Sequence, residues 1–264
     1  MSLPIITAAL ILRKKTLIHE QNVKPGRANK LLSYCVDKIA ISFEKTKDFF
    51  KKKNVILTGN PLRRELLNID KLTAIKEFSL SGDKFHILIM GGSQGAHRIN
   101  LLALETFSSF NGLMKDKLQL IHITGNKDYK RVKDGYNMLG IDARVFSFLD
   151  EVGYAYTASD LVIARSGATT ISEILFFGLP AILIPYPYAR THQTLNAKLL
   201  EDKGCCILWE EDKISKKELE NSLLRLYNNK SLLKQMSKNC NRLFIVDSTK
   251  KLADLVEGKP RASS

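Results

Sequence analysis

The stretch that decides the fold is LVIARSGATTISEI, residues 161–174. Its opening apolar run is typical of a buried strand. Gly167 and Ala168 then stand where a helix should begin, and a single carboxylate, Glu173, follows about one and a half turns later. Small residues at a helix N-terminus let another group approach the backbone amides. The stretch therefore predicts a strand, a tight turn and a helix whose first amides are open to a ligand.

The same alternation of short apolar runs and helix-length stretches continues along the chain. We predict strands at residues 16–18, 38–42, 54–58, 85–90, 119–124, 144–148, 160–164, 181–185 and 205–209. Between most of these strands we predict helix-length segments, for example at residues 96–110, 172–177 and 191–203, and the end of the chain should be helical at residues 216–227, 231–243 and 249–256. Apolar strands separated by helices indicate parallel sheets covered on both faces, and therefore an α/β protein.

A polar stretch, residues 68–84, separates three predicted strands from the other six. We therefore predict a partial N-terminal domain at residues 1–66 and a complete doubly wound domain at residues 67–264, whose last helix packs back on the first part. The first part begins within a helix and has no strand before it. Three strands are few for an independent α/β half, so we expect an N-terminal piece to be missing or the chain to be a fragment.

Composition restricts the class of partner. The chain has 264 residues, 44% of them hydrophobic, and no apolar run approaches the length of a membrane span. Its net charge of +14 favours an anionic partner, or it reflects scattered lysines. No zinc finger, RNA-recognition signature or basic zipper points to nucleic acid. No D-x-D motif or histidine pair indicates a metal, and we place His86 and His122 in the core.

In parallel sheets ligands bind beyond the carboxyl ends of the strands, so the loops there carry the functional prediction. GGSQGAHRIN, residues 91–100, follows one strand and opens a helix. Gly91, Gly92 and Gly95 permit positive φ and close backbone approach. The loop is neither G-x-G-x-x-G nor a Walker loop, so it is either a phosphate loop or simply a tight turn.

The quoted stretch has two readings as well. The amides after Gly167 would hold a diphosphate at the positive end of the helix dipole. Glu173 would accept the hydroxyls of a ribose diol, or it is an ordinary solvent-facing acid of the first turns. In YPYARTHQTLNA, residues 186–197, Gln193 and Asn196 lie on one helix face, and their amides suit sugar hydroxyls.

Two further loops are polar: HEQNVKPGRANK, residues 19–30, and GNPLRR, residues 59–64, where Arg63 can meet phosphate. Five polar or glycine-rich loops at strand ends predict one composite site. The motifs HEQN, GNP with Arg63, GGSQGA, RSGATT with Glu173, and HQ with Asn196 together closely resemble the MurG family of peptidoglycan N-acetylglucosaminyltransferases.

The resemblance implies a GT-B fold, in which two Rossmann-like domains face each other across a cleft. It also implies an inverting hexosyltransferase that moves GlcNAc from UDP-GlcNAc to the C4 hydroxyl of the MurNAc unit of lipid I. The product would be lipid II for cell-wall synthesis, made at the cytoplasmic face of the bacterial membrane, with no cofactor and no metal.

The resemblance also implies roles for individual residues. Asn22 corresponds to an acceptor-side and sugar contact, Arg63 and Ser93 to diphosphate contacts, and Leu149 to the position whose backbone holds uracil. The segment that grips diphosphate and ribose corresponds to Ala168, Thr169, Thr170, Ile171, Ser172 and Glu173. Gln193 and Asn196 correspond to the residues that read GlcNAc. His19 and Glu20 are the local candidates for the general base, although the family places a base in a loop that would precede residue 1.

Other readings remain open. The apolar residues 10–12 beside the basic residues 13–15 would touch an anionic membrane surface, or they form a buried helix with a basic end. The chain could be a UDP-sugar-binding module without turnover, or a GT-B enzyme that uses another UDP-sugar. Charge alone would fit a nucleic-acid-binding protein.

Overall fold

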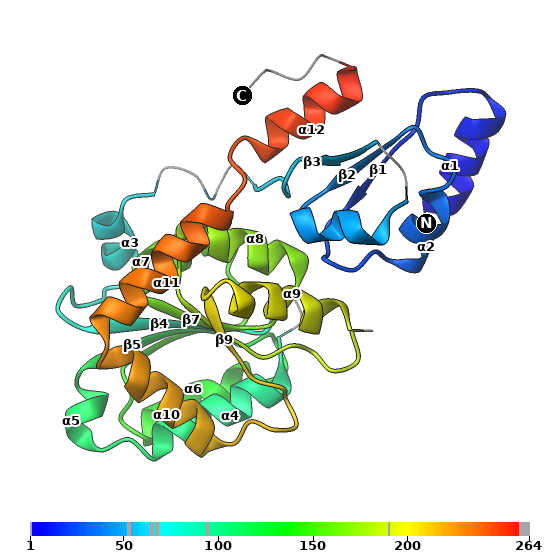
Figure 1. The fold of residues 1–264 in the computed structure, drawn as a ribbon. Helices are drawn as coiled ribbons and strands as arrows, with labels where there is room; N and C mark the ends of the chain where they lie inside the picture. Colours follow the sequence, from blue (N-terminus) through cyan, green and yellow to red (C-terminus); the bar gives the residue numbers. More distant parts are fainter. Residues whose placement is uncertain are drawn as a thin grey trace.

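The computed structural model describes residues 2–51, 54–63, 66, 69–92, 95–189 and 191–258. Within these ranges, nine strands form two separate parallel sheets (Figure 1). The first sheet has the order β1-β2-β3, with β1 at Leu17–Glu20, β2 at Lys38–Ile41 and β3 at Val55–Leu57. The predicted α/β class is confirmed.

The second sheet has the order β6-β5-β4-β7-β8-β9, in which the chain winds outward in both directions from the β4–β7 pair. Its strands are β4 (Phe85–Met90), β5 (Leu118–Ile123), β6 (Ala143–Phe146), β7 (Leu161–Ala164), β8 (Ala181–Leu183) and β9 (Cys206–Leu208). Strand order reverses between β4 and β7, and such a switch point is where doubly wound sheets bind ligands.

Helices connect the strands. In the first part they are α1 (Ser2–Ile11), α2 (Arg27–Leu32) and the 3₁₀ helix η1 (Glu44–Phe49). Around the second sheet they are α3 (Lys71–Glu77), α4 (His97–Ser108), α5 (Gly112–Lys115), α6 (Tyr129–Met138), α7 (Val152–Ala158), α8 (Ala168–Phe177), α9 (His192–Asp202), α10 (Lys216–Tyr227) and α11 (Lys230–Leu243). The last helix is α12 (Ser248–Glu257).

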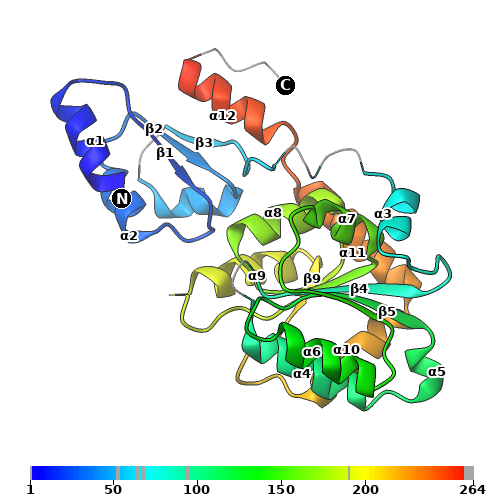
Figure 2. The same cartoon turned by 180° about the vertical axis from the view of Figure 1, so that it is seen from behind.

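The second sheet has a core on each face because its strands are apolar throughout. In β4, Leu88 and Met90 belong to one core cluster, while Ile87 and Ile89 belong to the other. This alternation follows from the two-residue period of a strand. Helices α7, α8 and α9 cover the first face, and α4, α6 and α10 cover the other (Figures 1 and 2). Helix α11 contributes side chains to both core clusters. Such two-sided burial leaves only the strand ends free for function.

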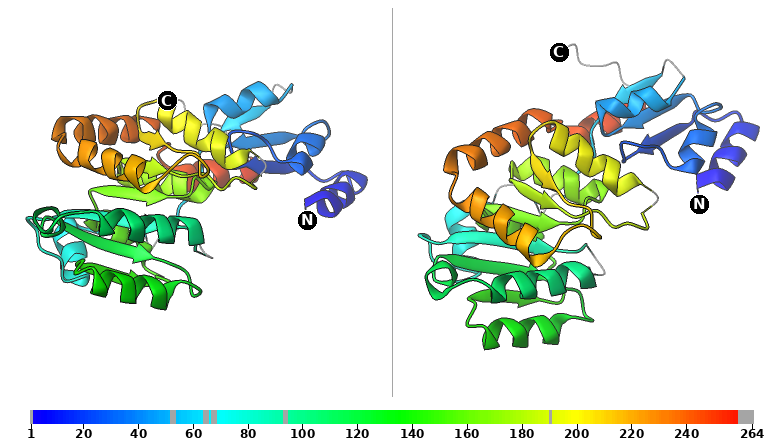
Figure 3. Two further views of the ribbon diagram at one scale, coloured as in Figure 1. Left: turned by 90° about the horizontal axis from the view of Figure 1, so that it is seen from below. Right: turned by 60° about the horizontal axis from the view of Figure 1, so that its bottom comes forward.

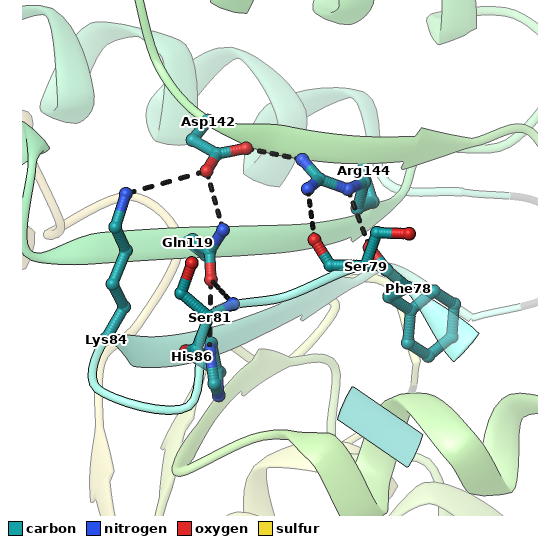
Figure 4. A network of polar contacts seen from close by, with 8 residues as sticks. All are labelled: Phe78, Ser79, Ser81, Lys84, His86, Gln119, Asp142 and Arg144. Carbon is teal, nitrogen blue, oxygen red and sulfur yellow. Dashed lines mark hydrogen bonds and ion pairs between the residues drawn. The ribbon is translucent and has the colours of Figure 1, made fainter. Parts of the chain in front are cut away.

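The polar segment 68–84 was predicted only as a separator, but it contains α3. Asp70 caps that helix by accepting a hydrogen bond from the Thr73 amide at 3.0 Å. The rest of the segment is tied to the amino ends of the strands (Figure 4). Arg144 donates to the carbonyls of Phe78 and Ser79, both at 2.7 Å. The end of the polar segment is therefore fixed to the second sheet.

Gln119 and His86 complete this attachment. Gln119 Oε1 accepts from the Ser81 amide at 2.7 Å, and its Nε2 donates to Asp142 at 2.6 Å (Figure 4). The His86 ring is buried and lies 2.9 Å from the Ser81 carbonyl. Its predicted place in the core is confirmed, as is that of His122.

The two sheet systems touch at several places, and hydrogen bonds mark two of them (Figure 3). At one, Lys38 Nζ donates to the Leu255 carbonyl at 3.3 Å, so α12 lies against the first sheet. At the other, the Val23 amide donates to Asn196 Oδ1 at 2.9 Å, which joins the loop after β1 to α9. The domain limits at residues 66 and 67 stay a prediction. In the described part of the chain, no helix is long and apolar enough to cross a membrane.

Candidate functional site

The turn from β7 into α8 lies at the switch point of the second sheet. Gly167 is the N-cap of α8, with φ −63° and ψ 151°, and no side chain caps the helix there. Among the described residues, a Cβ on Gly167 would meet only Thr170 Oγ1, at 3.8 Å. Neither backbone conformation nor packing requires glycine at this position. Among the described residues, therefore, no capping side chain occupies the first helical amides, and they can serve an anion.

The turn is held rigidly by the two residues before Gly167. Arg165 is buried, and its Nη1 donates to the carbonyls of Ile184 and Pro185 at 3.0 and 3.1 Å. Its Nη2 pairs with Glu211. Ser166 Oγ donates to the Gln193 carbonyl at 2.8 Å, which fixes the start of α9 beside the start of α8. Preorganised amides bind an anion with little ordering cost.

Within α8, side chains differ in what they can offer a ligand. Thr169 is exposed, and Ala168 and Thr170 are half-buried at the open end. Ile171 is fully buried in the core, so only its backbone is available. Ser172 is buried, and its hydroxyl donates to the Ala168 carbonyl at 2.9 Å. The predicted segment therefore offers mainly backbone groups.

Glu173 is 4% exposed, which excludes the reading of a solvent-facing acid. Tyr156 donates a hydrogen bond to Glu173 Oε2 at 3.0 Å, and Arg63 Nη2 lies 3.7 Å from Oε1. Burial raises the pKa of Glu173 above its usual value, while the hydrogen bond from Tyr156 and the charge of Arg63 oppose that shift. The predicted ribose and diphosphate contacts thus meet in one place.

The turn from β4 into α4 is tighter than the β7–α8 turn. A Cβ on Gly91 would stand 2.2 Å from the Ala96 amide nitrogen, and one on Gly95 would stand 2.1 Å from the Thr124 carbonyl oxygen. Gly92 and Gly95 have φ of +93° and +76°. The structure of the turn therefore accounts for all three glycines. Ser93, the predicted diphosphate contact, lies outside the described residues.

A buried polar chain supports this turn. Asn100 Nδ2 donates to the Thr124 carbonyl and to Asp128 Oδ2, both at 2.9 Å. Asn100 Oδ1 must then accept from His122 Nε2, at 3.0 Å. The other ring nitrogen of His122 accepts from Tyr136, at 2.9 Å. Burial lowers the pKa of His122 to about 3, so the ring is neutral.

Of the two predicted sugar readers, Asn196 contacts the loop after β1 and Gln193 contacts the loop after β8. Asn196 is fully buried, and its Nδ2 donates to Asn22 Oδ1 at 3.0 Å and to the Ser166 carbonyl at 3.1 Å. Gln193 is half-buried, and its Oε1 accepts from the Tyr186 amide at 2.8 Å. Its Nε2 has no hydrogen-bond partner among the described residues. Of the two amides, Gln193 keeps the free donor.

His19 and Glu20 differ sharply. Glu20 is buried, and its carboxylate accepts hydrogen bonds from four groups of its own loop: the Asn22 amide, Asn22 Nδ2, the Gly26 amide and Asn29 Nδ2. His19 is half-buried, with Nε2 3.1 Å from the Gly59 carbonyl and 3.2 Å from Ser42 Oγ. Burial lowers the pKa of His19, against opposing effects of the Gly59 carbonyl and the Glu20 charge. Glu20 therefore shapes the loop, whereas His19 keeps a basic nitrogen.

Leu149 lies just beyond the carboxyl end of β6 and is half-buried. A cavity of about 1430 Å³ lies elsewhere, at the amino ends of the strands, where Lys84, Lys117 and Asp160 line it. The candidate site is therefore the open carboxyl edge and not this cavity.

Two residues that contact the site were assigned no individual role in the sequence analysis, although Arg165 is part of the RSGATT motif. Tyr156 comes from α7 and reaches Glu173 across the sheet end, and Arg165 ties β7 to the end of β8. A tyrosine within an apolar helical stretch reads as ordinary core, so no local signal marks Tyr156.

The doubly wound sheet, the uncapped helix N-terminus at its switch point and the buried carboxylate on that helix fit the nucleotide-binding domain of a GT-B fold. The family model described as "Glycosyltransferase family 28 C-terminal domain" matches residues 86–256. The chain belongs to the MurG family of UDP-GlcNAc-dependent transferases.

Three known proteins illustrate the match. The chain is 40% identical to a UDP-N-acetylglucosamine--N-acetylmuramyl-(pentapeptide) pyrophosphoryl-undecaprenol N-acetylglucosamine transferase of Geobacter sp. (strain M21), over 94% of this chain and 66% of that protein. A transferase of the same name from Citrifermentans bemidjiense is 38% identical, over 98% of this chain and 71% of that protein. The crystal structure of Acinetobacter baumannii MurG superposes with a TM-score of 0.78 at 26% identity. The match covers 96% of this chain and 70% of that one. The chain thus spans about two thirds of the length of these relatives.

Proposed function

We propose that this protein transfers GlcNAc from UDP-GlcNAc to the C4 hydroxyl of the MurNAc unit of lipid I, with inversion, to give lipid II. The relatives named above are transferases for this pair of substrates by name. The observation in this chain that carries the proposal is the β7–α8 turn. Its open amides lie at the start of the helix that carries the buried Glu173.

The nucleotide would bind along α8. The amides of the first turn, which no side chain among the described residues caps, would hold the diphosphate with the helix dipole behind them. Glu173 would accept ribose hydroxyls, and backbone atoms near Leu149 would hold uracil. Arg63 now lies beside Glu173 with its side chain 56% exposed, so it is free to turn toward a phosphate. These groups would stabilise the negative charge that builds up on UDP as it leaves.

The acceptor hydroxyl would attack the anomeric carbon from the face opposite UDP. A bond then forms between the acceptor oxygen and that carbon, and the bond to UDP breaks with its electrons leaving on the phosphate. The proton of the hydroxyl needs a base, and we assign His19 as the candidate within this chain. Its Nε2 faces the Gly59 carbonyl, which leaves the Nδ1 lone pair for the proton.

Sugar recognition would come from Gln193 and from the Asn22–Asn196 pair. Gln193 Nε2 would donate to a GlcNAc hydroxyl. Asn196 already bonds Asn22, so it would act by holding the loop after β1 against α9 while the sugar lies beside both.

The acceptor is a lipid, so we also propose peripheral binding at the cytoplasmic face of the membrane. Helix α1 exposes Ile5 and Ile11, and Leu12 follows, each more than 60% exposed. Arg13, Lys14 and Lys15 come directly after them. Apolar side chains rimmed by positive charge favour an anionic lipid surface.

Parallel assays of binding and turnover test the proposal. UDP affinity is measured by calorimetry, and GlcNAc transfer from radiolabelled UDP-GlcNAc to a lipid I analogue is measured by product counting. Glu173→Gln should lower UDP affinity about a hundredfold, since it removes a charged hydrogen-bond acceptor. Glu105→Gln, an exposed carboxylate on α4, is the matched control and should change neither quantity.

The outcomes separate the alternatives. UDP binding without transfer would indicate a binding module and contradict the transferase proposal. Transfer from another UDP-sugar in preference to UDP-GlcNAc would contradict the donor assignment. Steeply salt-dependent DNA binding without UDP binding would favour the nucleic-acid reading.

A further inference from the structure

Tyr156 lies between the two turns of the site. It belongs to α7, and its ring stacks on Phe177 of α8 with centroids 5.0 Å apart and planes 10° from parallel. Its hydroxyl lies 3.0 Å from Glu173 Oε2 and 3.3 Å from the sulfur of Met90, the last residue of β4. The side chain is 1% exposed. A single hydroxyl therefore joins the start of the β4–α4 turn to the acid on α8.

The direction of this hydrogen bond is determined by chemistry. The phenol has one proton, and a carboxylate oxygen is a far better acceptor than a thioether sulfur. Burial, followed by the negative charge of Glu173, raises the pKa of Tyr156 well above its usual value, so the phenol stays protonated. Tyr156 is a permanent donor to Glu173 Oε2.

The two oxygens of Glu173 consequently have different surroundings. Oε2 is turned inward to Tyr156. Oε1 faces Arg63, whose side chain is more than half exposed, so this oxygen lies on the side open to a ligand. In the described part of the chain, Tyr156 of α7 and Arg63 of the segment after β3 are the titratable or charged side chains that contact this carboxylate.

We propose that Tyr156 is a positioning residue for the ribose site, because its hydroxyl holds Glu173 Oε2 and thereby presents Oε1 to the ribose diol. The stack on Phe177 fixes the ring, so the carboxylate keeps one orientation. The proposal rests on the proposed function, in which Glu173 receives the ribose. Tyr156 itself would not touch UDP.

Two ligands isolate the ribose contact. UDP and 2′,3′-dideoxy-UDP differ only in the hydroxyls that Glu173 would accept, so the ratio of their affinities reports that contact. Calorimetry from pH 5 to pH 8 gives the ratio for the unaltered protein, for Tyr156→Phe and for Glu173→Gln. Tyr156→Phe should lower UDP affinity about tenfold at pH 7 and leave dideoxy-UDP affinity unchanged.

The pH dependence of the affinity ratio distinguishes a positioning role from a merely structural one, because a structural role would not shift it. Glu173 must be ionised to accept both hydroxyls, so the ratio falls on the acid side as Glu173 takes up a proton. Tyr156→Phe removes a hydrogen bond that lowers the pKa of Glu173. The acid limb, which is the fall of the affinity ratio at low pH, should therefore move to higher pH in this variant.

Tyr136→Phe is the matched control, since Tyr136 is equally buried and its hydroxyl bonds His122 at 2.9 Å. It should alter neither the affinity ratio nor the position of the acid limb. If Tyr156→Phe does not fold, 3-fluorotyrosine at position 156 keeps the shape and makes the phenol a stronger donor. The acid limb should then move to lower pH.

The outcomes are distinguishable. If Glu173→Gln lowers the affinity ratio but Tyr156→Phe changes neither the ratio nor the acid limb, the positioning role is refuted and the ribose site stands. If Glu173→Gln leaves the ratio unchanged, the ribose assignment in the proposed function is itself wrong. A shift of the acid limb to higher pH with fluorotyrosine would also refute the positioning role.

Discussion

The second sheet carries two glycine-containing turns on neighbouring strands, one from β4 into α4 and the other from β7 into α8. In the first, a Cβ on Gly91 or Gly95 would collide with backbone atoms at 2.2 Å or less. In the second, a Cβ on Gly167 would make an ordinary contact at 3.8 Å. The fold requires glycine in the first turn, whereas neither φ nor the described neighbours require it in the second. Two glycine-containing turns that look alike in sequence can therefore need their glycines for different reasons, which the space around each Cβ position distinguishes.

The largest effect should come from Gly95→Ala. The new Cβ would stand 2.1 Å from the Thr124 carbonyl oxygen in a backbone with φ +76°, and backbone atoms cannot move aside. We expect a loss of at least about 3 kcal/mol in the free energy of unfolding, measured by urea titration. Gly82→Ala is the control, since no atom of the described residues lies within 4 Å of its Cβ position. Equal stability of the two variants would contradict this account of the turn.

The buried hydrogen-bond chain behind the β4–α4 turn, which includes His122, should make the free energy of unfolding depend on pH. The pKa of His122 falls to about 3 in the folded protein and is about 6.5 when unfolded. The unfolded state therefore binds more protons between these values, and stability is lost as pH falls below 6.5. Unfolding by urea should show a loss of about 2 kcal/mol between pH 6.5 and pH 5. His122→Gln should remove this part of the slope, and an unchanged slope would show that other groups cause it.

Gly167→Ala should separate binding from stability. The stability change should stay within about 0.5 kcal/mol, because the poorer N-cap and the stiffer unfolded chain offset each other. UDP affinity should fall about tenfold, or about 1.4 kcal/mol, since a methyl group keeps the phosphates from the helix amides. Calorimetry and urea titration on the same sample measure both. Unchanged UDP affinity would place the diphosphate elsewhere.

Gly92→Ala should have the smallest effect, and it separates backbone strain from collision. Gly92 has φ +93°, yet among the described residues nothing lies within 4 Å of its Cβ position. Strain alone should cost about 1 kcal/mol in the free energy of unfolding. A loss as large as that of Gly95→Ala would mean that the collision at Thr124 is not what distinguishes the two glycines.

Much of the fold follows from local pattern. Apolar runs set all nine described strands to within two residues at most ends, because burial on both faces of a parallel sheet leaves a continuous apolar signal. Helix α3 was missed because a seven-residue helix has little periodicity, and it depends on the cap at Asp70 and on packing. The α/β class and the MurG family are both confirmed.

For the candidate site too, some features follow from local sequence and others depend on the tertiary structure. The sequence by itself determined which loops are polar or glycine-rich, because turn chemistry and strand ends are local properties. Only the tertiary structure decided that Glu173 is buried against Tyr156 and Arg63, and that Asn196 bonds Asn22 across 174 positions of chain. The physical reason is that burial, hydrogen-bond partners and pKa depend on groups that folding brings together from distant segments.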